Sequence, residues 1–424
     1  MFGDHPKIPP GPKGGARQQL VRIREAVRRW RKKKSEERAR RARAQAPEHE
    51  AALPTVSEEV LDLALAVVFG ADEAIPPPRE QVIAVAARPF FSRGLFLARS
   101  KIGKYGEAVE QFTQAIALDP TAAFLYYVRG MAFHHMGSMQ EALSDLDEAI
   151  RLDQSNWLFY EQRGDILMRL AELGRALQDW DVLVRLQPRS ASAYRRRARC
   201  QMLRGEYERA VADCDEAFLL ELGKVSTLRI RAYCLFMLGR WQDALSDCDQ
   251  VLAVDAKSES IHKYRARCLV KLDRREEALV NFGEAIRLDP SASLHQERGA
   301  CLVIMGRWED AVADYTASLA FGAEYAEAAY SGRASCYGML RRYEEAIRDW
   351  DQYVMLQPGK ADGYFARGVC YGDQGDYLRA VQDFTRAIER EPTAEIYRAR
   401  AFAYRALGME AEARADDLTA LEAN

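Results

Sequence analysis

Residues 197–214 read RARCQMLRGEYERAVADC, and residues 231–248 read RAYCLFMLGRWQDALSDC. The two stretches start 34 residues apart and share an arginine, an alanine, a cysteine and a terminal Asp-Cys at matching places. The residue after the shared arginine is alanine in both stretches, Ala198 and Ala232. A glycine or alanine recurs at the equivalent position with spacings of 33 to 35 residues: Gly130, Gly164, Ala198, Ala232, Ala266, Gly299, Ala334, Gly368 and Ala401. We call it the small residue of each unit. A fixed period of this length indicates a stack of similar structural units.

Further positions follow the same period. An alanine stands twelve residues after each small residue, and in most units a large or apolar residue follows four residues later: Leu146, Trp180, Cys214, Cys248, Phe282, Tyr315, Trp350 and Phe384. A proline closes several units: Pro120, Pro188, Pro290, Pro358 and Pro392. One more unit lies upstream, where Phe96 stands at the small position and Gly94 is displaced by two residues. We expect that first unit to be a cap or a distorted repeat.

The pattern resembles the tetratricopeptide repeat family, whose 34-residue unit is a helix–turn–helix with small residues where its helices cross. The resemblance covers residues 89–424 and about ten tandem repeats. It implies an all-α fold, a right-handed superhelical solenoid of stacked antiparallel helix pairs. We therefore divide the chain into a basic N-terminal arm (1–50), a short helical connector or cap (51–88) and the solenoid (89–424).

An arginine directly precedes each small residue in units two to ten, and we call it the repeat arginine. Sixteen residues later an aspartate stands in eight of these nine units, while unit six has Asn281. We predict a charge-assisted Arg–Asp hydrogen bond between the two helices of each unit, worth roughly 1.5–3 kcal/mol when partly buried. The resulting Asp-x-Asp strings, such as Asp213 and Asp215, do not predict a metal site, because residues two apart on a helix diverge.

The eight cysteines follow the period as well, which predicts small buried side chains rather than disulfides or metal ligands. Paired Cys-x2-Cys ligands are absent, and so are the sequence patterns of phosphate loops, nucleophile elbows and zinc proteases. The sequence therefore predicts a protein that is not an enzyme, with no catalytic residues, no cofactor and no metal.

The resemblance implies that the first helices line a concave groove, reached by residues three before and one after the small residue. These positions predict a partner-binding set: Arg195, Arg199, Arg229, Tyr233, Lys263, Arg267, Tyr127 and Phe365. One interpretation is a site for an extended acidic segment or a chain terminus, because arginine forks match carboxylates. The other is a solvated face balanced by acids of the second helices. The two groove asparagines of heat-shock co-chaperones in this family are missing, so we expect no binding of heat-shock chaperone C-terminal peptides.

The charge of the chain is divided. Residues 1–50 hold 15 basic and 6 acidic residues, so the net charge of −2 combines an arm of +9 with a body of −11. The candidate contact residues of the arm are Arg28, Arg29, Trp30, Arg31, Lys32, Lys33 and Lys34. Four uses stay open: binding nucleic-acid phosphates, docking on an anionic membrane or a partner's groove, organellar targeting, or a helix that is either solvated without a partner or folded back onto the acidic body.

We predict from these observations a non-enzymatic scaffold or adaptor that binds protein partner segments in its concave groove. The alternative is a nucleic-acid (RNA)-associated protein that uses the basic arm, with the solenoid as the docking module. No run of 18 apolar residues and no secretory signal occur, so we expect no transmembrane segment and a cytoplasmic location, with nuclear or organellar locations open through the arm. The partner's identity and the oligomeric state do not follow from the sequence.

Overall fold

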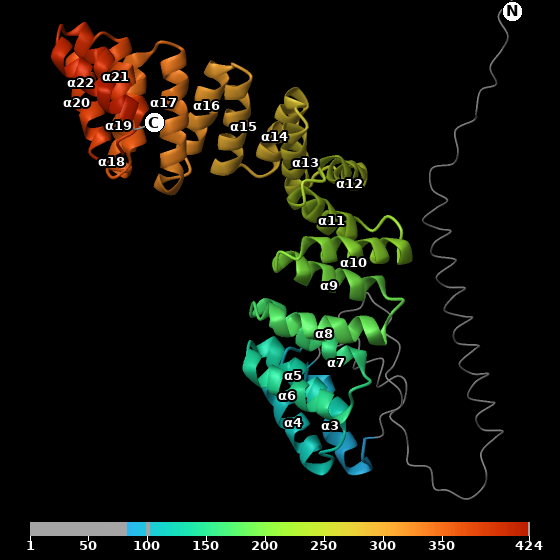
Figure 1. Cartoon of the computed structure of the whole chain (residues 1–424). Coiled ribbons are helices and arrows are strands. Elements are labelled where there is room, and N and C mark those ends of the chain that lie inside the picture. Colours follow the sequence, from blue (N-terminus) through green and yellow to red (C-terminus); the bar gives the residue numbers. More distant parts are fainter. Residues whose placement is uncertain (1–82, 99–101, 423–424) are drawn as a thin grey trace, which may run out of the picture.

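The computed structural model describes residues 83–98 and 102–422, and most of these residues are helical. Figure 1 shows the helices stacked side by side in one curved row that runs from α3 to α22. The basic arm, most of the connector and the seven candidate residues of the arm lie outside the described residues.

The helices of the described ranges form ten successive pairs, and each pair is one unit. The units, in order, are α3 (Arg88–Ala98) with α4 (Tyr105–Leu118), α5 (Ala123–Met136) with α6 (Met139–Leu152), α7 (Trp157–Arg169) with α8 (Leu173–Leu186), α9 (Ala191–Leu203) with α10 (Tyr207–Leu220), α11 (Val225–Met237) with α12 (Trp241–Val254), α13 (Glu259–Lys271) with α14 (Arg275–Leu288), α15 (Ala292–Ile304) with α16 (Trp308–Leu319), α17 (Ala326–Met339) with α18 (Tyr343–Leu356), α19 (Ala361–Asp373) with α20 (Tyr377–Ile388), and α21 (Ala394–Ala406) with α22 (Glu410–Glu422). Odd labels mark first helices and even labels mark second helices. The predicted all-α solenoid of helix pairs is confirmed.

The turn inside each unit requires one residue with a left-handed backbone, seven residues after the small residue. Glycine takes this place in six of units two to ten, for example Gly137 at φ 84° and Gly239 at φ 75°. Ala171, Asp273 and Arg341 take it in the other three, at φ 56° to 62°. Glycine adopts this conformation without a steric penalty, which explains its frequency at the turn.

The small residues lie where the two helices of a unit cross. A Cβ atom placed on Gly164 would come within 2.8 Å of the Trp180 ring, and one on Gly368 within 2.8 Å of the Phe384 ring. In the units that have alanine at the crossing, two of the opposing residues are Cys214 and Cys248, each fully buried. In these four units glycine at the crossing faces a large ring, and alanine at the crossing faces a small thiol. The sum of the two side-chain volumes therefore varies less than either volume alone.

The first unit differs from the expectation in one respect. Gly94, not Phe96, fills its helix crossing, because a Cβ on Gly94 would meet the Phe112 ring at 2.5 Å while Phe96 is exposed. The unit keeps the ordinary packing and places two more residues between the crossing and the second helix. Upstream, Ile83 is buried and the short 3₁₀ helix η1 (Val85–Ala87) leads directly into α3.

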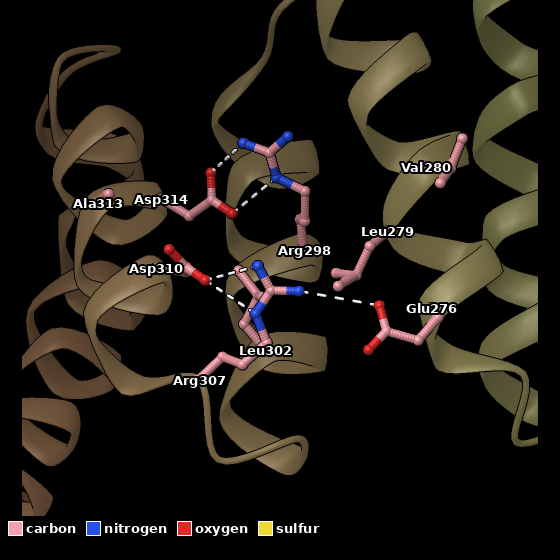
Figure 2. Close-up of a pocket in the computed structure, with 9 residues that line it drawn as sticks. All are labelled: Glu276, Leu279, Val280, Arg298, Leu302, Arg307, Asp310, Ala313 and Asp314. Carbon is pink, nitrogen blue, oxygen red and sulfur yellow. Dashed lines mark hydrogen bonds and ion pairs between the residues drawn. The ribbon is translucent and has the colours of Figure 1, made fainter.

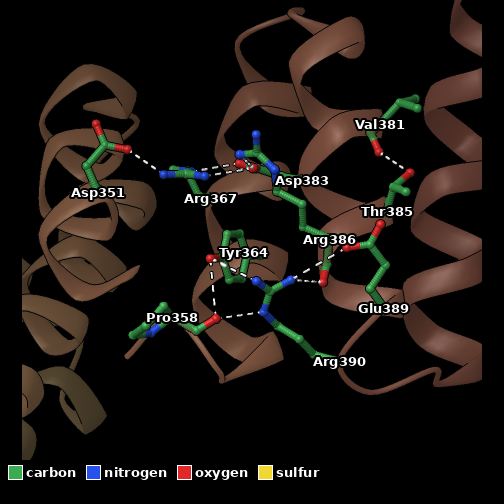
Figure 3. Close-up of polar contacts among 10 residues, drawn as sticks. All are labelled: Asp351, Pro358, Tyr364, Arg367, Val381, Asp383, Thr385, Arg386, Glu389 and Arg390. Carbon is green, nitrogen blue, oxygen red and sulfur yellow. Dashed lines mark hydrogen bonds and ion pairs between the residues drawn. The ribbon is translucent and has the colours of Figure 1, made fainter. Parts of the chain in front are cut away.

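The predicted Arg–Asp pairs are present in all eight units that carry both residues. Each guanidinium donates from Nε and from one Nη to the two oxygens of the aspartate, as in Arg298–Asp314 (2.8 and 2.6 Å, Figure 2) and Arg367–Asp383 (2.7 and 2.7 Å, Figure 3). The aspartates are buried and the arginines partly so. In unit six Arg265 instead donates to Asp249, and Asn281 donates to the carbonyl of Glu277 and contacts His262.

Eight of the nine repeat arginines also join their unit to the one before it. The acceptor lies two residues after the aspartate position of the preceding second helix, which we call the linking position. Arg367, for example, donates from its remaining nitrogen to Asp351 of α18 at 2.7 Å (Figure 3). The Asp-x-Asp strings are thereby explained, because the first aspartate bonds within its own unit and the second bonds the arginine of the next unit.

We predict that Asp213→Ala lowers the melting temperature of the chain more than Asp215→Ala does. Asp213 is buried and receives two hydrogen bonds from Arg197 at 2.7 Å, so its loss should destabilise by about 2 kcal/mol. Asp215 is exposed and holds Arg231 by one bond, which should be worth at most about 1 kcal/mol. Thermal unfolding followed by circular dichroism measures both, and equal melting temperatures for the two variants would contradict the assignment.

Candidate partner-binding surface

The first helices form the inner face of the curved array. Several of them contact the first helix of the next unit, namely α9 with α11, α11 with α13, α15 with α17 and α19 with α21. Among the described residues, neighbouring second helices make no contact of that extent. Helices on the inside of a bend come closer together than those outside it, so the first-helix face is the concave one, as the resemblance implies.

Most of the predicted basic residues of this face already hold a carboxylate of the same chain. Arg195 donates to Glu221 at 2.7 Å, and Arg267 donates twice to Glu297 at 2.7 and 2.6 Å. Further ion pairs join Arg229 to Asp255 and, at 3.3 Å, Lys263 to Glu259. These pairs neutralise four of the five cations, so the face presents less positive charge than its sequence suggested.

Arg199 is the fifth cation, and it is exposed with no ion pair or hydrogen bond to the described residues. Tyr233 and Phe365 are half-buried and accessible, with Tyr233 packed edge-on against Tyr264 at a centroid distance of 5.3 Å. Tyr127 is fully buried beside Phe124 and Phe159, at centroid distances of 5.4 and 5.3 Å. Its burial explains the raised pKa of its hydroxyl, and no part of its side chain is exposed for a partner.

The sequence reasoning missed a column of exposed apolar side chains on the same face. It lies five residues after the small residue, at the C-terminal ends of α9, α11, α15 and α17. Leu203, Met237, Ile304 and Met339 are 53%, 45%, 61% and 61% exposed. In α13 the equivalent residue is Lys271, which is exposed. The alignment of repeats that revealed the arginines would have shown this column, because the residues share one position of the period.

A pocket of about 360 Å³ opens beside this column between α11, α13 and α15. Phe236, Val270 and Ile304 supply apolar walls from the first helices, and Phe282 of α14 lies at its base. The Arg267–Glu297 pair and Lys271 form its polar edge. The arrangement suits one bulky apolar side chain with a polar group next to it.

Comparison with known proteins agrees with the geometry. Two family models, each described as tetratricopeptide repeat, match residues 361–393 in one case and residues 93–156 and 162–218 in the other. The matched segments cover helix pairs at both ends of the array. These three segments match the tetratricopeptide repeat family.

Similar proteins include one curated protein and two solved structures. Sperm-associated antigen 1 of Rattus norvegicus is 32% identical over 82 residues, which are 19% of this chain and 9% of that protein, so the chain covers only a small part of it. A tetratricopeptide repeat protein from Parabacteroides merdae is 18% identical, with 57% of this chain and 94% of that chain covered and a TM-score of 0.44. The C-terminal part of a repeat protein from Cytophaga hutchinsonii is 16% identical, with 56% and 98% covered and a TM-score of 0.47.

The eight cysteines of the tetratricopeptide array are all buried and free. Burial raises the pKa of the Cys200 and Cys268 thiols to about 11 and that of Cys234 to about 12. Within the described ranges no three His, Cys, Asp or Glu side chains could together hold a metal ion. No helix of those ranges is long and apolar enough to cross a membrane.

We predict that the folded tetratricopeptide array reacts slowly with a thiol reagent. At pH 8 the raised pKa values keep these thiols protonated, and the thiolate is the reactive form. Titration with Ellman's reagent should show little reaction in native buffer and eight reactive thiols in guanidinium chloride. Rapid labelling of several thiols without denaturant would contradict the buried placement.

Proposed function

We propose that this chain is a non-enzymatic scaffold that holds a segment of another protein against its inner face. The observation that carries the proposal is the apolar column Leu203, Met237, Ile304 and Met339 with the adjoining pocket. Large apolar side chains gathered on one exposed face of a soluble protein commonly mark an interaction site. The match of three segments to tetratricopeptide repeat models supports a protein partner.

The chemistry of the column indicates the kind of segment that it fits. Burying apolar surface stabilises a complex by roughly 25 cal/mol per Å², so each covered side chain contributes to affinity. Met237 and Met339 are unbranched and adapt their shape to different partners. Lys271 and Arg199 are exposed cations on the same face, and neither has an ion pair within the described residues. We therefore infer an extended partner segment with bulky apolar residues and a nearby carboxylate. Its preference for acidic residues should be weaker than five unpaired cations would give.

Negatively charged substitutions in the apolar column should abolish binding of the partner. We predict that the double variant Met237→Asp with Ile304→Asp loses its specific partner, because two buried carboxylates would face apolar groups. Val254→Asp is the matched control, since Val254 is 73% exposed at the end of α12, a second helix. The tagged full chain is purified from its own cells, the partner is identified by mass spectrometry, and its dissociation constant is measured with purified variants. An increase of at least about tenfold is expected only for the double variant, and unchanged affinity would refute the proposed surface.

A second function rests on the charge of residues 1–50, which carry a net +9. Such an arm would bind RNA or DNA phosphates with an affinity that falls as salt rises. The scaffold function and this one are compatible, since they use different parts of the chain.

Deletion of residues 1–50 separates the two functions. If the arm binds nucleic acid, the deletion should abolish retention of a labelled single-stranded RNA in a filter-binding assay at low salt, while the partner of the inner face stays bound. RNA binding that survives the deletion would exclude the arm as its site. Lost partner binding after the deletion would place the arm in the scaffold function.

A further inference from the structure

The joints between units follow one rule with a single exception among units two to ten. At eight of the nine joints that lead into these units, the repeat arginine donates to the side chain at the linking position of the preceding unit. The acceptors are Thr113, Asp147, Asp181, Asp215, Asp249, Thr316, Asp351 and Thr385, at 2.6 to 3.1 Å. The exception is the joint between α14 and α15, where the linking position is Gly283.

Arg298 is consequently left with one acceptor residue. Its Nε and Nη2 bond Asp314, and a Cβ placed on Gly283 would have Nη1 of Arg298 as its nearest neighbour, at 3.7 Å. Figure 2 shows this nitrogen on the side of the guanidinium away from Asp314, with no interaction to any residue drawn. The side chain of Arg298 is 29% exposed, whereas those of the other eight repeat arginines are 11% to 21% exposed.

The notch beside Arg298 is larger than its counterpart at a linked joint. The notch between α14, α15 and α16 has a volume of about 450 Å³, and Leu279, Val280 and Leu302 line it together with Arg298. The equivalent notch between α10, α11 and α12, where Asp215 fills the linking position, has about 230 Å³. Val280 is two-thirds exposed, so one wall of the larger notch is apolar and open to solvent.

A second carboxylate at Arg298 would repeat an arrangement that the chain already contains. Arg163, Arg197, Arg231 and Arg367 each hold two aspartates at once. The nearby acids of the notch are also occupied, because Arg307 lies 2.7 Å from Asp310 and 3.8 Å from Glu276. The acidic residues of the notch therefore leave the free donor of Arg298 available.

We propose that this notch is a second docking site, which receives an aspartate side chain of a partner protein with a flanking apolar residue on Val280. The incoming carboxylate takes the place that Asp215 or Asp351 occupies at other joints and accepts a charge-assisted hydrogen bond from Arg298. Residues of α14, α15 and α16 line the notch, and none of them lines the pocket of the inner face, so the site is separate from the proposed inner-face function.

Two substitutions at one position test the site. Gly283→Asp supplies the missing acceptor from within the chain, while Gly283→Ala adds a methyl group and leaves Arg298 free. Both should fold and gain thermal stability, because Gly283 has an ordinary helical backbone and glycine is unfavourable inside a helix. The probe is a fluorescein-labelled peptide, GSLDLSG, measured by fluorescence polarisation against the full chain, with GSLTLSG and GSLKLSG as matched peptides.

The expected result is saturable binding of the aspartate peptide to the wild type and to Gly283→Ala, weakened at least about tenfold by Gly283→Asp. Equal affinity for the two variants, or no binding to the wild type up to millimolar concentration, would overturn the site. Equal binding of the threonine peptide would overturn the choice of a carboxylate. If millimolar sodium acetate displaces the labelled aspartate peptide, the notch binds small carboxylates in general, and the proposal of a protein segment as its ligand would be overturned.

The reverse substitution tests the rule itself. Asp215→Gly removes the acceptor of Arg231 and creates a second notch of the same kind, so the number of bound aspartate peptides per chain should rise from one to two. A stoichiometry that stays at one, in a variant whose circular dichroism shows intact helices, would overturn the role assigned to the linking position.

Discussion

The close approach of two helices at each small residue is the constraint on which the rest of the array depends. Only glycine or alanine allows the opposing ring or thiol to fill the crossing, as Gly164 does for Trp180. At that separation an arginine on the first helix reaches the aspartate of the second with two parallel bonds. The same side chain then reaches back to the preceding unit, so packing inside a unit fixes how units follow one another.

The parts of the structure that repeat were predictable from the chain alone. In units two to ten the small residues and the repeat arginines recur in nine copies and their aspartates in eight, and such agreement identifies a structural role without related sequences. Balance of the inner-face cations by acids was one of two interpretations of the sequence, but the individual partners could not be selected, because the long side chain of Arg195 could reach several acids and spacing does not select Glu221. Tyr127 was misjudged for a related reason: its position in the period gives its direction, but the packing of its neighbours decides its exposure.

The two faces of the array differ in what they offer a partner. The inner face combines apolar side chains with cations that are mostly neutralised, whereas the notches between units hold arginines and aspartates that are mostly bonded to one another. Both surfaces are interrupted around unit six. There Lys271 breaks the apolar column, Asn281 replaces the aspartate and Gly283 replaces the linking acceptor. The changes therefore gather in one unit, whose neighbours keep the regular pattern.

The absent link at Gly283 also bears on how the array comes apart. In a linear stack each unit is stabilised only by its neighbours, so the cooperativity of unfolding is transmitted joint by joint. The eight linked joints lie in two unbroken runs, five from α4 to α13 and three from α16 to α21, and the joint between α14 and α15 separates these runs. The apolar core is continuous across this joint, where Phe282 and Ala285 of α14 belong to one cluster with Leu294 and Cys301 of α15, so we expect the absent bond to weaken the coupling between the two runs without abolishing it.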